Sequence, residues 1–152
     1  MKKILLFAFA LLFSVGIFAQ KSKKVEIFCP NNGGVSITAH INYNEDNKIK
    51  DTTILFLMRD ARYTQLIEYI TVCSGNYDEV IDFLQQVEKF AKENEPGMST
   101  TIEGSSISYD KLMGGRNLFI YEKGKNGYCI ISPKYLTKFK DKIIDWEKKN
   151  KK

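Results

Sequence analysis

Histidine is the scarcest chemically versatile residue in this chain of 152 residues. The single histidine is His40, and it alternates with Thr38 and Asn42, neither of which is a base partner. A Ser-His-Asp catalytic triad or a Cys-His catalytic dyad would have to use this one residue. The cysteines are also few and widely separated, whereas zinc ligands occur in closely spaced pairs. These scarcities argue against nucleophilic catalysis and a zinc site.

The carboxylate pairs and the glycine-rich stretches match no known catalytic or nucleotide-binding pattern. The carboxylate pair Glu45 and Asp46 lies in a polar stretch, and Asp78 and Glu79 suit the first turn of a helix. The glycine-rich stretches have neither the Walker nor the dinucleotide-binding spacing. No catalytic constellation is recognisable, so we expect a protein that is not an enzyme and needs no cofactor or metal.

Only one long hydrophobic run is present, and it lies at the N-terminus. Two lysines precede an apolar run from Ile4 to Phe18, which ends at Ala19 and is followed by polar and basic residues. The run is shorter than the ~20 residues of a membrane span, and this order is typical of a bacterial Sec signal peptide. We predict a signal peptide over 1–19 and export to the periplasm or beyond; the alternative is an uncleaved anchor.

Removal of the predicted leader leaves residues 20–152, a length that suits one domain. The formal charge of the whole chain is +5, and part of it belongs to the leader. We expect a single α+β domain that ends in a frayed basic tail and has no transmembrane segment once the leader is removed.

Cys29, Cys73 and Cys129 would meet oxidising conditions in an exported protein. Three is an odd number, so at most one internal disulfide can form. Each cysteine lies in an apolar, strand-like run, and the competing interpretation is a set of small buried hydrophobic side chains. The sequence leaves both alternatives open.

Hydrophobic periodicity divides the domain into strands and helices. Residues 35–44 alternate apolar and polar side chains, which predicts a strand with one buried face. The runs 52–58 and 63–74 are rich in β-branched and aromatic residues and indicate a β-hairpin. Residues 76–95 and 133–146 repeat apolar side chains at helical spacing, which predicts two amphipathic helices.

Capping and turn residues mark the ends of these elements. Asn76 with Glu79 predicts a capping box, and Ser132 before Pro133 predicts a second helix start. The dipeptide Asn126-Gly127 favours a type I′ hairpin turn.

These signals predict an α+β fold with two layers. We expect a mainly antiparallel sheet of about six to seven strands with two amphipathic helices on one face. The similar starts of the two helices also suggest a strand–strand–helix pseudo-repeat.

Charge is distributed unevenly over the predicted elements. The first helix is acidic and the second is basic, and Lys134, Lys138 and Lys142 form a candidate basic surface. Arginine is scarce, with three in the chain, and two of them occupy the predicted hairpin tip. Arg59, Arg62 and Tyr63 are therefore the candidate interaction residues, because Arg and Tyr are enriched at interface anchors. Solvated helix faces and a hairpin tip kept soluble by charge are the competing explanations.

Two hypotheses on function remain. The first is an exported, non-enzymatic interaction protein of the bacterial envelope, including an inhibitor or immunity-type protein, whose protein partner is unidentified. The alternative is a module that binds a polyanion, glycan or small ligand through the exposed sheet face and the basic C-terminal helix. Export argues against nucleic acid as the partner.

Overall fold

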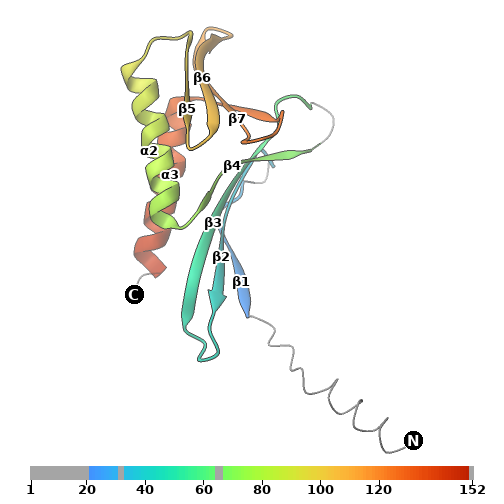
Figure 1. The fold of residues 1–152 in the computed structure, drawn as a ribbon, viewed down its shortest axis with the longest axis vertical. Helices are drawn as coiled ribbons and strands as arrows, with labels where there is room; N and C mark the ends of the chain where they lie inside the picture. Colours follow the sequence, from blue (N-terminus) through green and yellow to red (C-terminus); the bar gives the residue numbers. More distant parts are fainter. Residues whose placement is uncertain (1–20, 31–32, 64–66, 151–152) are drawn as a thin grey trace, which may run out of the picture.

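The computed structural model describes residues 21–30, 33–63 and 67–150 (Figure 1). The predicted signal peptide lies outside these residues. Two four-stranded antiparallel sheets are present, each ordered as in the chain. The first comprises β1 (Ser22–Phe28), β2 (Val35–Tyr43), β3 (Ile49–Arg59) and β4 (Tyr69–Gly75). The second comprises β5 (Met98–Ile102), β6 (Ser105–Leu112), β7 (Gly115–Tyr121) and β8 (Tyr128–Ile131).

The α+β class is confirmed, but the predicted count of six to seven strands is too low. The described residues form eight strands in two sheets. Glu103 and Gly104 form a tight turn with φ of 50° and 85°. Two adjacent residues at positive φ are typical of a type I′ hairpin turn. They divide this stretch into β5 and β6.

A helix follows each sheet in the chain. Helix α2 (Tyr77–Glu93) follows β4, and α3 (Pro133–Asn150) follows β8. The element order therefore repeats four strands and a helix, so the predicted strand–strand–helix unit is too short. Each half forms an antiparallel meander before its helix begins.

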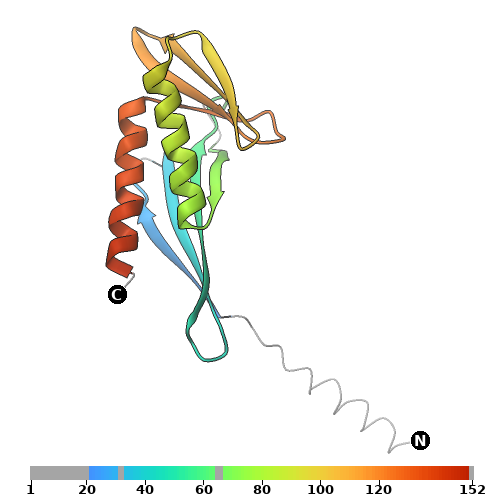
Figure 2. The ribbon, with the colours of Figure 1, turned by 60° about the vertical axis from the view of Figure 1, so that its left-hand side comes forward.

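The two helices lie side by side against one face of the sheets (Figure 2). Helix α2 contacts β3, β4 and β5, and α3 contacts β1 and β7, so both helices reach both sheets. The side chains between the layers form one apolar cluster with contributions from both halves. Burial of this surface on a common helix layer packs the two halves together. No helix in the described part of the chain has the length and apolar character of a membrane span.

Strand β2 shows the predicted alternation only in part, because Thr38, on the face predicted to meet water, is 2% exposed. Ile37 and Ala39 are fully buried, whereas His40 lies on the opposite face and is half-buried. The His40 Nε2 atom lies 3.4 Å from the Thr38 hydroxyl. The histidine is thus paired with a neighbouring hydroxyl on the outer face of the sheet.

The capping box at the start of α2 is confirmed. The Asn76 side chain accepts a hydrogen bond from the Glu79 N–H at 3.0 Å, and the Glu79 carboxylate accepts one from the Asn76 N–H at 2.8 Å. Helix α3 begins at Pro133, as the sequence predicts. These local contacts fix where each helix leaves its sheet.

The predicted type I′ turn at Asn126-Gly127 is wrong. The turn lies three residues earlier, where Gly124 has φ of 72° and the Lys125 N–H donates to the Glu122 carbonyl. Gly127 is required for a different reason: a Cβ there would lie 2.5 Å from Ile70 Cγ2. The β7–β8 hairpin therefore packs closely on the first half of the chain.

A buried carboxylate links the two helices. Glu88 of α2 accepts a hydrogen bond from the Thr137 hydroxyl at 2.6 Å and forms an ion pair with Lys140, both on α3. Lys92 approaches the same carboxylate at 3.3 Å. The hydrogen bond from Lys140, followed by that from Thr137, lowers the pKa of Glu88 to about 2.

We predict that this carboxylate contributes to stability and to its loss in acid. The pKa is lower in the folded state than in the unfolded chain, so the contribution is complete above the unfolded value near 4.5 and disappears as pH falls towards 2. Glu88→Gln should lower the free energy of unfolding at pH 7 by about 2 kcal/mol, and this free energy should then fall less steeply as the pH is lowered. Urea unfolding at several pH values measures both effects.

Glu93→Gln is the matched control, because Glu93 is an exposed acid of the same helix. Its unfolding curve should follow that of the wild type throughout the acid range. If Glu88→Gln and the wild type lost stability in parallel below pH 5, the link between the helices would not have the assigned role.

Candidate functional site

A pocket of about 490 Å³ lies where α3 begins against the ends of both sheets. Its volume falls within the range of small-ligand sites. Strand ends from both halves of the chain and the first two turns of α3 form its walls. The lining residues are Phe28, Pro30, Gly34, Val35, Met58, Asn117, Ile130, Ile131, Ser132, Tyr135, Lys138 and Phe139.

Aromatic side chains form much of the pocket wall. The ring centroids of Phe28 and Phe139 are 5.4 Å apart, and those of Tyr135 and Phe139 are 6.4 Å apart with nearly parallel planes. The Phe139 ring also packs edge-to-face with Phe56 of the core, with the ring centroids 5.5 Å apart. The rigid core therefore holds the aromatic wall in place, and this limits the ordering cost of binding a ligand.

The charge at the pocket is positive. Lys138 is the one charged residue in the lining, and its Nζ atom lies 5.8 Å from the centre of the Phe28 ring. The first turn of α3 contains no acidic residue, so the positive end of the helix dipole is not neutralised within that turn. A cation above an apolar wall can recognise an amphipathic molecule with an anionic group.

The predicted basic surface is only partly associated with this pocket. Lys138 lines it, and Lys134 lies beside it, with its Nζ atom 5.3 Å from the Tyr135 ring centre. Lys142 is exposed one turn further along α3 and does not line the pocket. Sequence reasoning missed Phe28 and Tyr135, because neither belongs to a regular hydrophobic pattern that would mark a site.

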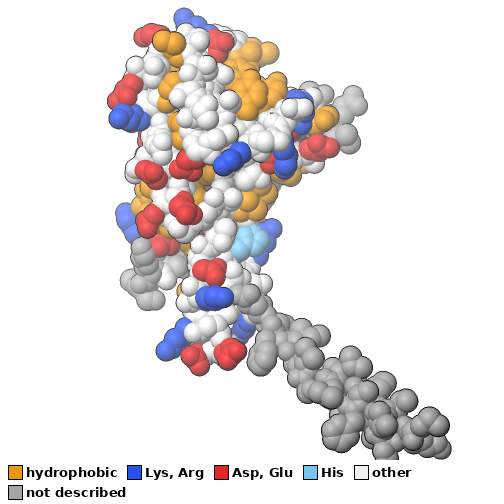
Figure 3. Space-filling view, in the orientation of Figure 1, with side chains coloured by type: hydrophobic (Ala, Val, Ile, Leu, Met, Phe, Trp, Pro, Cys, Tyr) orange, Lys and Arg blue, Asp and Glu red, His pale blue; other side chains and the backbone are white. Residues whose placement is uncertain are grey.

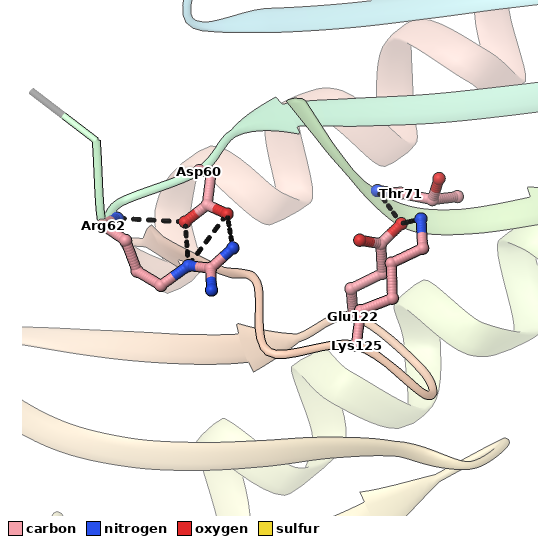
Figure 4. A network of polar contacts seen from close by, with 5 residues as sticks. All are labelled: Asp60, Arg62, Thr71, Glu122 and Lys125. Atoms are coloured by element: carbon pink, nitrogen blue, oxygen red, sulfur yellow. Dashed lines mark hydrogen bonds and ion pairs between the residues drawn. The ribbon is translucent and has the colours of Figure 1, made fainter. Parts of the chain in front are cut away.

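The predicted hairpin tip forms a contact between the two halves (Figure 4). Asp60 is 2% exposed, and its carboxylate accepts hydrogen bonds from the backbone N–H and the guanidinium of Arg62. The closest of these joins Arg62 Nη2 to Asp60 Oδ2 at 2.7 Å. The Ala61 N–H then donates to the Tyr128 carbonyl at 2.8 Å, which joins the connection after β3 to β8.

The Glu122 carboxylate forms a second contact between the two halves of the chain. Glu122, at the end of β7, accepts a hydrogen bond from the Thr71 N–H of β4 and pairs with Lys125, each at 3.0 Å (Figure 4). Burial alone would raise the pKa of Glu122, but the Thr71 and Lys125 contacts outweigh it, and the pKa is lowered. For Asp60, the hydrogen bond from Arg62 lowers the pKa against the opposing effect of burial.

These contacts give the three candidate interaction residues different environments. Arg62 holds the Asp60 carboxylate, and its guanidinium carbon lies 5.0 Å from the Tyr63 ring centre. Tyr63 is 36% exposed, whereas Arg59 ends β3 and is half-buried. Arg62 therefore has a structural role at Asp60, whereas the exposed ring of Tyr63 is accessible to a partner.

The three cysteines are free thiols in the structure: Cys29 is exposed, Cys73 half-buried and Cys129 buried. Burial raises the pKa of the Cys73 thiol well above its usual range and that of Cys129 to about 12. Thiols that resist ionisation react slowly, because the thiolate is the nucleophile.

Among residues 21–30, 33–63 and 67–150, no group of three or more His, Cys, Asp or Glu side chains converges in the manner of metal ligands. The chain matches no family model and no curated protein. Arguments about function therefore rest on the geometry of this molecule.

We predict that thiol-reactive reagents distinguish the three cysteines. In the native protein, Ellman's reagent should modify Cys29 rapidly and leave Cys73 and Cys129 largely unmodified, because burial raises their pKa values. In denaturant without reductant, all three should react. Cys29→Ser is the control and should abolish the rapid phase. A denatured count of one thiol in the wild type would contradict the free-thiol state and indicate a disulfide.

Proposed function

We propose that this protein is an exported, non-enzymatic binding protein whose ligand is a small amphipathic molecule with an anionic group. The observation that supports the proposal is the pocket at the start of α3, where apolar and aromatic walls surround one cation, Lys138. A carboxylate or sulfonate joined to an alkyl chain or aromatic ring matches this combination of burial and charge.

The binding mode assigns a role to each part of the pocket. The apolar body of the ligand would lie against Phe28 and Phe139, where it displaces water from apolar surface. Its anionic group would accept a hydrogen bond from the Lys138 ammonium near the start of the helix. In the described part of the chain no ion pair engages Lys138, so its charge need not first leave an acidic partner.

We predict that removal of this cation weakens binding of an amphipathic anion. Lys138→Met keeps the aliphatic stem but removes the charge, and it should lower the affinity for dodecanoate about tenfold, which corresponds to ~1.4 kcal/mol. Isothermal titration calorimetry with dodecanoate, and displacement of the fluorescent anion 1-anilinonaphthalene-8-sulfonate, measure the change. The matched control is Lys142→Met, which removes the same charge from the same helix outside the pocket.

A second variant tests the pocket itself. Val35→Trp adds bulk to the lining at a half-buried position and should reduce dodecanoate binding without affecting the fold. Equal affinities for Lys138→Met, Lys142→Met and the wild type would refute the proposed binding mode. A steep salt dependence spread over all the lysines of α3 would instead support polyanion binding, since each released counterion adds to the slope.

Protein–protein contact, as in an inhibitor or immunity-type protein, remains a second candidate. The observation in its favour is the Tyr63 ring, exposed and lying under the Arg62 guanidinium, because Tyr and Arg are enriched at binding hot spots. Tyr63→Ala is the suitable variant, since loss of Arg62 would also disturb Asp60. Recovery of a partner from the native envelope should fall at least tenfold with Tyr63→Ala and stay unchanged with Tyr43→Ala. Equal recovery with both variants would exclude this surface.

A further inference from the structure

The second sheet has an outer face that the helices do not cover. Leu118, Ile120 and Cys129 are buried towards the helices, so the side chains that alternate with them point outward. On β7 and β8 these outward residues are Phe119, Tyr121, Tyr128 and Ile130, all half-buried. Figure 3 shows hydrophobic side chains exposed beside the β6–β7 part of the molecule.

Three rings of this face form a continuous strip, here called the aromatic strip: Phe119, Tyr121 and Tyr128. The centroids of Phe119 and Tyr128 are 6.2 Å apart, and those of Tyr121 and Tyr128 are 5.4 Å apart. Tyr121 and Tyr128 are direct cross-strand partners. The sheet therefore fixes the spacing of the rings.

A shallow groove of about 470 Å³ lies next to the aromatic strip. We call it the hydroxyl groove, because every residue that lines it has a hydroxyl group: Ser99, Thr100, Thr101, Ser106, Ser108 and Tyr121. The register places Ser99 opposite Ser108 and Thr101 opposite Ser106. Strands β5 and β6 thus present rows of hydroxyls beside the rings of β7 and β8, with Tyr121 in both sets.

The hydroxyl groove contains no charged side chain, although charged residues make up 27% of the chain. An anionic or cationic ligand would find no complementary charge there. Serine, threonine and tyrosine hydroxyls can both donate and accept hydrogen bonds, so they match a ligand whose own polar groups are neutral hydroxyls. The adjacent ring faces carry negative quadrupole charge and attract slightly positive C–H groups.

Neutral sugars combine these two features, because a pyranose ring has an apolar C–H face and an edge of hydroxyl groups. We propose that the outer face of β5–β8 binds a neutral polysaccharide. Its pyranose faces stack on the aromatic strip, and its hydroxyl edges occupy the hydroxyl groove. The hydroxyl groove and the amphiphile pocket share no lining residue, although Ile130 of the same outer face lines the pocket.

The experiment measures the retention of the whole mature protein by neutral polysaccharides. Dextran, α-mannan, xyloglucan and hydroxyethylcellulose are the probes, and polygalacturonate is the anionic comparison. We expect binding to at least one neutral polymer with little dependence on salt. Tyr121→Ala should lower that affinity at least fivefold, whereas Tyr121→Phe should retain most of it because the ring remains. Tyr43→Ala is the matched control, a half-buried tyrosine of β2 outside both sites.

A second variant separates loss of the site from loss of the fold. Ser106 is exposed, so Ser106→Glu should preserve the thermal unfolding midpoint while placing an unmatched charge in the groove, and it should abolish polysaccharide binding. Dodecanoate affinity should stay unchanged in both the Tyr121 and the Ser106 variants. Failure of all four neutral polymers to bind, equal binding by all variants, or binding of polygalacturonate alone would overturn the proposal, whatever the outcome at Lys138.

Discussion

The packing of α2 against α3 is the constraint on which the rest of this structure depends. Each four-stranded sheet has one apolar face, and neither half could bury that face with its own strands alone. The two helices form a common layer that contacts both sheets, and Glu88 fixes their relative position through Thr137 and Lys140. The ends of the sheets are joined by the hydrogen bonds from the Ala61 N–H to the Tyr128 carbonyl and from the Thr71 N–H to the Glu122 carboxylate.

The candidate pocket is a consequence of this arrangement. Helix α3 must cross from the end of β8 to the first sheet, so its first two turns lie over the junction of the two sheets. Phe139 fills part of that junction by packing on Phe56, whereas the space beside Phe28 is left open. Lys138 then occupies the border between apolar wall and solvent. The same connectivity leaves the far face of the second sheet uncovered, where aromatic and hydroxyl side chains gather.

The sequence predicted the features that depend on local patterns. The alternation around Ile37, the stripes of both helices and the Asn76 capping box were all recognisable, because each involves residues close in the chain. It did not predict the division into two sheets, which depends on how distant strands pair. Gly127 shows where prediction from local sequence fails. The dipeptide Asn126-Gly127 suggested a turn, but the structure requires glycine at 127 because Ile70 approaches closely, and no local pattern reveals that contact. The role of Arg62 was not predictable for the same reason, because it depends on the burial of Asp60, which is set by the tertiary structure.

The central claim is that Lys138 and the aromatic wall around it bind an amphipathic anion. The most direct test is a crystal structure of the protein with dodecanoate. The account predicts that the carboxylate lies within hydrogen-bond distance of Lys138 Nζ and that the alkyl chain lies against the rings of Phe28 and Phe139. A ligand ordered elsewhere on the protein, with this pocket occupied only by water, would contradict it.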